Sequence, residues 1–164
     1  MPDWTTHVLV AWSLATILGF RFKQFSQKNV AIVMLGALIP DLYKITLVSD
    51  SFGLHLQSLL IPIHLPIGSL LIAAIISLFF IEKRSIFIFL AIGVGTHYAL
   101  DLLMFSGGME IFYPFSTLKF QIGIISVTDF HVTILSIILA SVVFLVYKKF
   151  NKNNSDSMEI MNNQ

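Results

Sequence analysis

The sequence has no cysteine and few charged side chains, and each shortage excludes a class of protein. Without cysteine, the chain forms neither disulfides nor thiolate metal sites. Charged residues make up 12% of the 164 residues, about half the share that is usual in a soluble domain. The formal net charge is +1, so we expect no bulk attraction to nucleic acid. The N-terminus also lacks the basic region that begins a cleaved signal peptide, and Asp3 opposes one.

What the sequence has in abundance is apolar residues, which make up 56% of the chain and give a mean hydropathy of +0.85. A backbone in lipid must satisfy its own hydrogen bonds, and long apolar runs with little alternation favour helices. We therefore predict an all-α protein, a polytopic transmembrane helical bundle of about four to five membrane segments. Residues 1–150 form its single domain, and residues 151–164 form a polar, disordered cytoplasmic tail.

The expected membrane segments follow from a reading of span-length apolar runs. The first is short for a full span, and the second is interrupted by Pro40 and Asp41, which predicts a kinked or broken helix. We place the five segments at about residues 6–20, 30–48, 59–81, 85–105 and 122–147.

The distribution of Lys and Arg predicts the orientation of these segments. If the five segments alternate in direction, eight Lys and Arg residues lie on one side and only Lys44 and Lys119 on the other. Basic residues stay preferentially in the cytoplasm. We therefore expect a multi-pass protein of the cell (inner or plasma) membrane with its N-terminus outside and its C-terminus in the cytoplasm.

Ionisable side chains from distant segments reach a similar depth in this arrangement. Counted from the cytoplasmic end at about 1.5 Å per residue, they lie roughly 16 to 27 Å into the membrane, in its outer half. A charge at such depth costs a few kcal/mol or more, so these residues are expected to face the bundle interior and find partners. They are His7, Asp41, His64, His97, Asp101, Asp129 and His131.

Imidazole and carboxylate groups together suit a divalent metal, most simply zinc, which needs three or four ligands. Manganese and iron are alternatives, because the same donors bind them. His97 and Asp101 are four residues apart, so they share one helix face and can reach one ion. A metal there would neutralise the carboxylate and occupy the imidazole lone pair.

Structural roles are alternatives for each of these residues. His97 and Asp101 can form a hydrogen-bonded pair that stabilises the bundle. His64 can cap a helix, Asp41 can be an N-cap for the residues after it, and His7 can be an ordinary first-turn residue.

Three acidic or imidazole groups near the outer surface have further alternatives. Asp129 and His131 start the fifth segment, where they can cap it, hydrogen-bond a metal ligand or serve as a general base. Glu110 lies in the outer loop, where we expect it to be solvated.

The order of five motifs resembles a known family. "MPDWTTH", "LGALIPDLYK", "HLPIGSLL", "GVGTHYALDLL" and "IFYPFS" occur in the order seen in the YdjM-like inner-membrane proteins, which are described as metal-dependent hydrolases. That family is in turn distantly similar to zinc-dependent phospholipase C and the related zinc nucleases. The resemblance covers nearly the whole chain up to the outer loop and implies a helical protein with a His/Asp metal site.

Transferred to this chain, the family motifs imply that the metal ligands are His7, Asp41, His64, His97 and Asp101. One departure stands out. Many bacterial members have a second histidine in the central segment, in a pattern such as H-R-x-x-T-H-S, whereas this chain has Gly68 and Ser69 near that place.

Three functions remain open from the sequence. The first is a metal-dependent hydrolase of an ester or phosphoester in a lipid or lipid-linked substrate, with Asp129 or His131 as a base or hydrogen-bond partner of a ligand. The second is an ion- or proton-translocating protein, which predicts ionisable residues at several depths rather than one. The third is a bundle that a metal holds together without catalysis.

Overall fold

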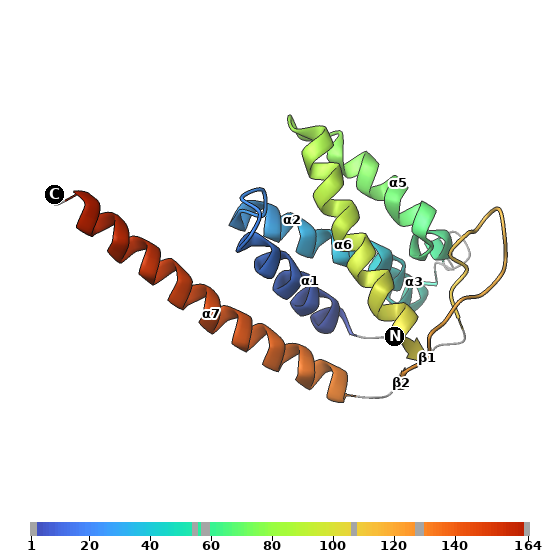
Figure 1. Ribbon diagram of the computed structural model, residues 1–164. Helices are drawn as coiled ribbons and strands as arrows, with labels where there is room; N and C mark the ends of the chain where they lie inside the picture. Colours follow the sequence, from blue (N-terminus) through green and yellow to red (C-terminus); the bar gives the residue numbers. More distant parts are fainter. Residues whose placement is uncertain (1–2, 54–55, 57–59, 106–107, 127–129, 163–164) are drawn as a thin grey trace.

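The computed structural model describes residues 3–53, 56, 60–105, 108–126 and 130–162 (Figure 1). Over these residues the chain is all-helical apart from one two-residue strand pair, which agrees with the predicted fold class. The elements are α1 (Trp4–Gly19), α2 (Gln27–Leu38), the 3₁₀ helix η1 (Pro40–Ile45), α3 (Thr46–Ser51), the 3₁₀ helix η2 (Ile61–His64), α5 (Pro66–Ser77), α6 (Lys83–Leu103), β1 (Met104–Phe105), β2 (Ile125–Ser126) and α7 (His131–Asn162).

Helix α6 is the centre of the fold, in contact with α1, α2 and α5 (Figure 1). Glycines allow α2 and α6 to touch through their backbones. A Cβ atom on Gly36 would lie 2.3 Å from the Leu90 carbonyl oxygen, and one on Gly93 would lie 2.1 Å from the Val33 carbonyl oxygen. Small residues at such crossings are typical of helices packed in membranes. The crossing brings the last turn of α2 against the half of α6 that carries His97.

The second helical segment is interrupted after α2, as the sequence predicts. Helix α2 ends at Leu38, and η1 starts at Pro40, whose ring cannot continue an α-helix. The axis turns by 50° between α2 and the following helical segment. The break removes Asp41 from the regular helix and turns it into the bundle, where it is buried.

The expectation of four to five membrane segments is met in part. Among the described residues, α6 and the first part of α7 are long and apolar enough to cross a membrane. If the bent segment α2–η1–α3 counts as one further span, the total is three. Helix α1 has 16 residues and α5 has 12, so they measure about 24 and 18 Å, short of the roughly 30 Å hydrocarbon core. They are apolar helices below span length.

The last helix begins and ends later than the expected fifth segment. The residues before it pair in parallel with the end of α6. Ile122 N–H donates to Leu102 O and Ile124 N–H to Leu103 O, both at 2.8 Å, and β2 continues this pairing with β1. Between them, Gly123 has a φ of +65°, which interrupts helical geometry despite the apolar run.

Helix α7 then packs along α1 and extends beyond it (Figure 1). It continues to Asn162, through residues for which the composition predicted a disordered tail. No proline or glycine follows Tyr147 to end the helix earlier.

Candidate metal centre

The first turn of α1 holds His7 at full burial. Asp3 caps the helix, because its Oδ1 accepts the Thr6 N–H at 2.7 Å. Partial burial raises the pKa of Asp3, but the hydrogen bonds from Thr6 and Thr133 together outweigh it, so the pKa lies below its usual value. The Thr6 and Thr133 hydroxyls also meet at 3.0 Å, which ties α1 to α7. These contacts fix the turn that carries His7.

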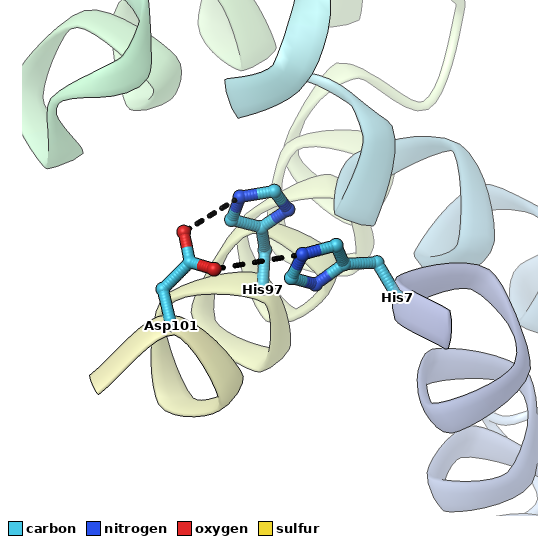
Figure 2. Close-up of side chains that lie close together, drawn as sticks. All are labelled: His7, His97 and Asp101. Carbon is cyan, nitrogen blue, oxygen red and sulfur yellow. Dashed lines mark ion pairs between the residues drawn. The ribbon is translucent and has the colours of Figure 1, made fainter. Parts of the chain in front are cut away.

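One turn of α6 supplies His97 and Asp101, which are both buried. The His97 Nε2 atom lies 3.2 Å from Asp101 Oδ2, as expected for their spacing of four residues. The His7 ring stacks on the His97 ring with centroids 3.7 Å apart. The Nε2 atom of His7 lies 3.6 Å from Asp101 Oδ1. Figure 2 shows both rings facing the same carboxylate, one from α1 and one from α6.

The two 3₁₀ helices add Asp41 and His64. The Asp41 Oδ1 atom is 4.0 Å from both His64 Nδ1 and His97 Nε2, and His64 Nε2 is 3.5 Å from Asp101 Oδ2. The other Asp41 oxygen, Oδ2, binds the ammonium of Lys44 at 2.6 Å. The structure therefore brings all five predicted ligands together in two groups that could hold an ion, His7, His97 and Asp101, and Asp41, His64 and His97.

Backbone carbonyls determine which nitrogen of two rings can bind a metal. His97 Nδ1 lies 2.8 Å from Ala37 O, and His64 Nδ1 lies 3.1 Å from Pro40 O. A carbonyl oxygen only accepts hydrogen bonds, so each Nδ1 carries the proton and donates it. In the neutral rings each Nε2 then carries a lone pair, and both Nε2 atoms lie close to Asp101 Oδ2. Such an outer hydrogen bond is how proteins orient histidine ligands towards a metal.

Six buried nitrogen and oxygen atoms of this cluster have no hydrogen-bond partner among the described residues. Buried polar groups are almost always hydrogen-bonded, and nitrogen lone pairs facing a carboxylate repel it unless a cation lies between them. An ion held by either of the two groups would give most of these atoms a partner. The six unpartnered atoms in the cluster are His7 Nδ1 and Nε2, Asp41 Oδ1, His97 Nε2, and Asp101 Oδ1 and Oδ2.

A short hydrogen-bond chain positions the segment that carries His64. Ser69 Oγ donates to Ile63 O at 2.6 Å, so the Tyr98 hydroxyl, 2.5 Å away, donates to Ser69. A Cβ atom on Gly68 would lie 1.9 Å from Pro62 O. A side chain at position 68 would collide with this backbone, and Ser69 beside it is fully buried.

A cavity of about 570 Å³ opens beside the cluster, with His64 and Asp101 in its wall. Half of its described lining residues come from the loop between β1 and β2. Glu110, which we expected to be solvated, is half-buried and lines this cavity. Sequence reasoning also missed Tyr113 and Lys119 as lining residues, because no periodicity marks which residues of a long loop line a cavity. Lys44 was recognisable only from its spacing of three residues after Asp41.

Two further candidates are not brought to the cluster by any described contact. Asp129 lies outside the described residues. His131 is the exposed first residue of α7, and its ring stacks on Phe130 with centroids 4.4 Å apart. Their expected roles as a base, or as hydrogen-bond partners of a ligand, stay predictions.

The fold and the site define a class: a helical membrane protein with a buried His/Asp cluster that could hold a metal ion. The family model for the YdjM inner membrane protein matches residues 1–161. The chain belongs to this family, which confirms the resemblance seen in its motifs. No curated protein and no solved structure matches the chain.

Proposed function

We propose that this protein is a membrane-embedded, metal-dependent hydrolase that cleaves an ester or phosphoester in a lipid or lipid-linked substrate. The observation that carries the proposal is the cavity of about 570 Å³ that shares His64 and Asp101 with the cluster. Structural metal sites are closed by protein ligands, whereas catalytic sites keep one position open to substrate. A cluster that forms part of a cavity wall favours the second kind.

The protein residues in this proposal have distinct tasks. His7, Asp41, His64, His97 and Asp101 hold one or two divalent cations, zinc in the simplest case and manganese or iron as alternatives. Bound there, the ion supplies Lewis-acid polarisation of the substrate and activation of water. The carbonyls of Ala37 and Pro40 keep two imidazoles in the tautomer that offers Nε2. Burial of the cluster excludes bulk water from the remaining donors.

We place this cavity on the extracytoplasmic side. Helix α6 carries Lys83 and Arg84 in its first turn and Asp101 in its last, so the basic end lies opposite the cluster. Because the chain has no cysteine, single cysteines report topology directly. We expect Thr117→Cys to react with a membrane-impermeant maleimide in intact cells and Glu82→Cys only after permeabilisation. The reverse labelling pattern would refute the orientation.

The test of the function compares the wild type with the double variant His97→Ala plus Asp101→Ala, both purified in detergent and loaded with zinc or manganese. We expect stoichiometric metal and hydrolysis of soluble phosphoester probes in the wild type, and loss of both in the variant. Thr96→Ala is the matched control, because it removes a neighbouring hydroxyl that donates to Gly93 O and leaves every metal-ligating side chain in place.

Two outcomes would overturn the proposal. A wild type that cannot be loaded with metal has no metal centre at this position. A wild type that binds metal but cleaves no ester or phosphoester, while the double variant unfolds at a lower temperature, has a metal that only stabilises the bundle.

A further inference from the structure

Two charged residues outside the metal centre line the cavity beside the cluster, one acidic and one basic. Of the described residues that line it, Lys119 is the one cationic side chain. Asp101 belongs to the cluster, whereas Glu110 comes, like Lys119, from the loop between β1 and β2. A substrate in this cavity therefore meets an ammonium and a carboxylate in addition to the His/Asp cluster.

The loop backbone fixes where these two side chains start. Met109 and Phe120 form an antiparallel bridge, with N–H to O distances of 2.8 and 2.9 Å. Glu110 follows one bridged residue and Lys119 precedes the other, so the two lie across from one another. Gly108, at a φ of +84°, packs against the base of the lysine, since a Cβ there would lie 2.8 Å from Lys119 Cβ.

The two charged groups are available for a ligand. No ion pair joins Glu110 or Lys119 to another described residue. The situation differs at Lys44, whose ammonium is engaged by Asp41 at 2.6 Å. Among the described residues that lie near the cluster, Lys119 is therefore the lysine whose ammonium has no ion-pair partner.

We propose that the cavity binds a zwitterionic phosphoester head group, with Lys119 contacting the phosphate oxygens and Glu110 the amine. This inference rests on the proposed function and names its substrate class. An ammonium forms strong, charge-assisted hydrogen bonds with phosphoryl oxygens. The carboxylate of Glu110 would repel a purely anionic ligand. A ligand that also carries an amine would instead form an ion pair with Glu110. Ile61, Leu65 and Met109 line the same cavity and suit the apolar part of such a molecule.

The test uses two phosphonates, whose P–C bond does not hydrolyse: 2-aminoethylphosphonate, and ethylphosphonate as its matched analogue without the amine. Binding to the zinc-loaded full-length protein in detergent is measured by calorimetry, and metal content is measured on the same samples. We expect the wild type to prefer the amine-bearing ligand by up to about fivefold, the usual contribution of one accessible charge pair. Glu110→Gln should abolish that preference, and Lys119→Gln should weaken both ligands by up to about fivefold with unchanged metal content.

Three results would overturn the inference. Lys119→Gln that binds both phosphonates like the wild type would show that this lysine is only solvated. Glu110→Gln that tightens both ligands equally would show that the carboxylate merely repels anions. Metal-loaded wild type that binds neither ligand would exclude a phosphate site in the cavity.

The source of the head group is resolved by competition. Lysophosphatidylethanolamine and glycerophosphoethanolamine share the head group, so a lipid substrate is indicated if the lipid form displaces the phosphonate better, and a soluble one if both compete equally. The outcome is separable from the proposed function, because binding does not require turnover. Hydrolysis without any amine preference would refute the inference alone, whereas amine preference without hydrolysis would refute only the proposed catalysis.

Discussion

Replacing Gly93 with alanine tests whether the contact between α2 and α6 maintains the metal centre. The added Cβ would lie 2.1 Å from Val33 O, 2.6 Å from Ala37 N and 2.8 Å from Gly36 C. All three atoms belong to the backbone of α2, so no side chain can rotate to make room. An ordinary contact needs about 3.4 Å or more, so the two helices must separate by about 1 Å.

This separation acts directly on His97, which lies one turn after Gly93 on the same helix face. Its Nδ1 bonds to Ala37 O at 2.8 Å. Adding about 1 Å takes this bond beyond the range of a hydrogen bond, and metal sites tolerate only about 0.2 Å in their ligand distances. Loss of such an outer hydrogen bond typically lowers metal affinity about 10- to 100-fold. Overpacking of a tight contact also destabilises a protein by about 1–3 kcal/mol.

The same helix offers a matched control. A Cβ on Gly95 meets nothing within 4 Å, so Gly95→Ala should keep its metal and gain up to about 1 kcal/mol of helix stability. The assay is thermal unfolding in detergent together with elemental analysis of both variants. A Gly93→Ala protein with full metal content and an unchanged melting temperature would refute this account of the helix contact.

Three further substitutions test individual parts of the site. Lys44→Met leaves buried Asp41 Oδ2 without its cation at 2.6 Å, so we expect a lower melting temperature that added zinc partly restores; an unaltered melting temperature would contradict this role. Tyr98→Phe removes the hydroxyl that donates to Ser69 and should weaken zinc binding about tenfold in a chelator competition, unless the position of His64 does not depend on this chain. His131→Ala should lower kcat by about 10²-fold or more with unchanged metal content if the residue is a general base, and a residue at the helix start without that role leaves kcat near the wild-type value.

The five cluster residues could be predicted because their cost in lipid leaves few alternatives. Ionisable side chains within apolar segments must face partners, and counting from the basic ends of the segments placed these residues at one depth. The spacing of His97 and Asp101 then fixed a shared helix face. Pro40 predicted the helix break that turns Asp41 inwards. Each of these inferences uses only local sequence and the energetic cost of burial.

The parts that sequence reasoning missed depend on the path of the chain outside the helices. The apolar run from residue 122 reads as a helix, but Ile122 and Ile124 instead pair with the end of α6, because Leu102 and Leu103 there offer unpaired carbonyls. That pairing draws the loop between β1 and β2 over the cluster and turns Glu110 and Lys119 into a cavity wall. Long-range backbone pairing of this kind leaves no periodic signal in a sequence.

The same pairing explains how the site is both buried and open. The side chains of His7, His97 and Asp101 are almost fully covered. Among the described residues, the 3₁₀ helix that carries His64 and the loop that carries Lys119 line the cavity beside the cluster, together with Asp101. In this arrangement the rigid α2–α6 contact sets the metal geometry, while the two irregular segments determine what reaches the ion. Substitutions in the glycine contact should therefore change metal affinity, and substitutions in the loop should change ligand preference.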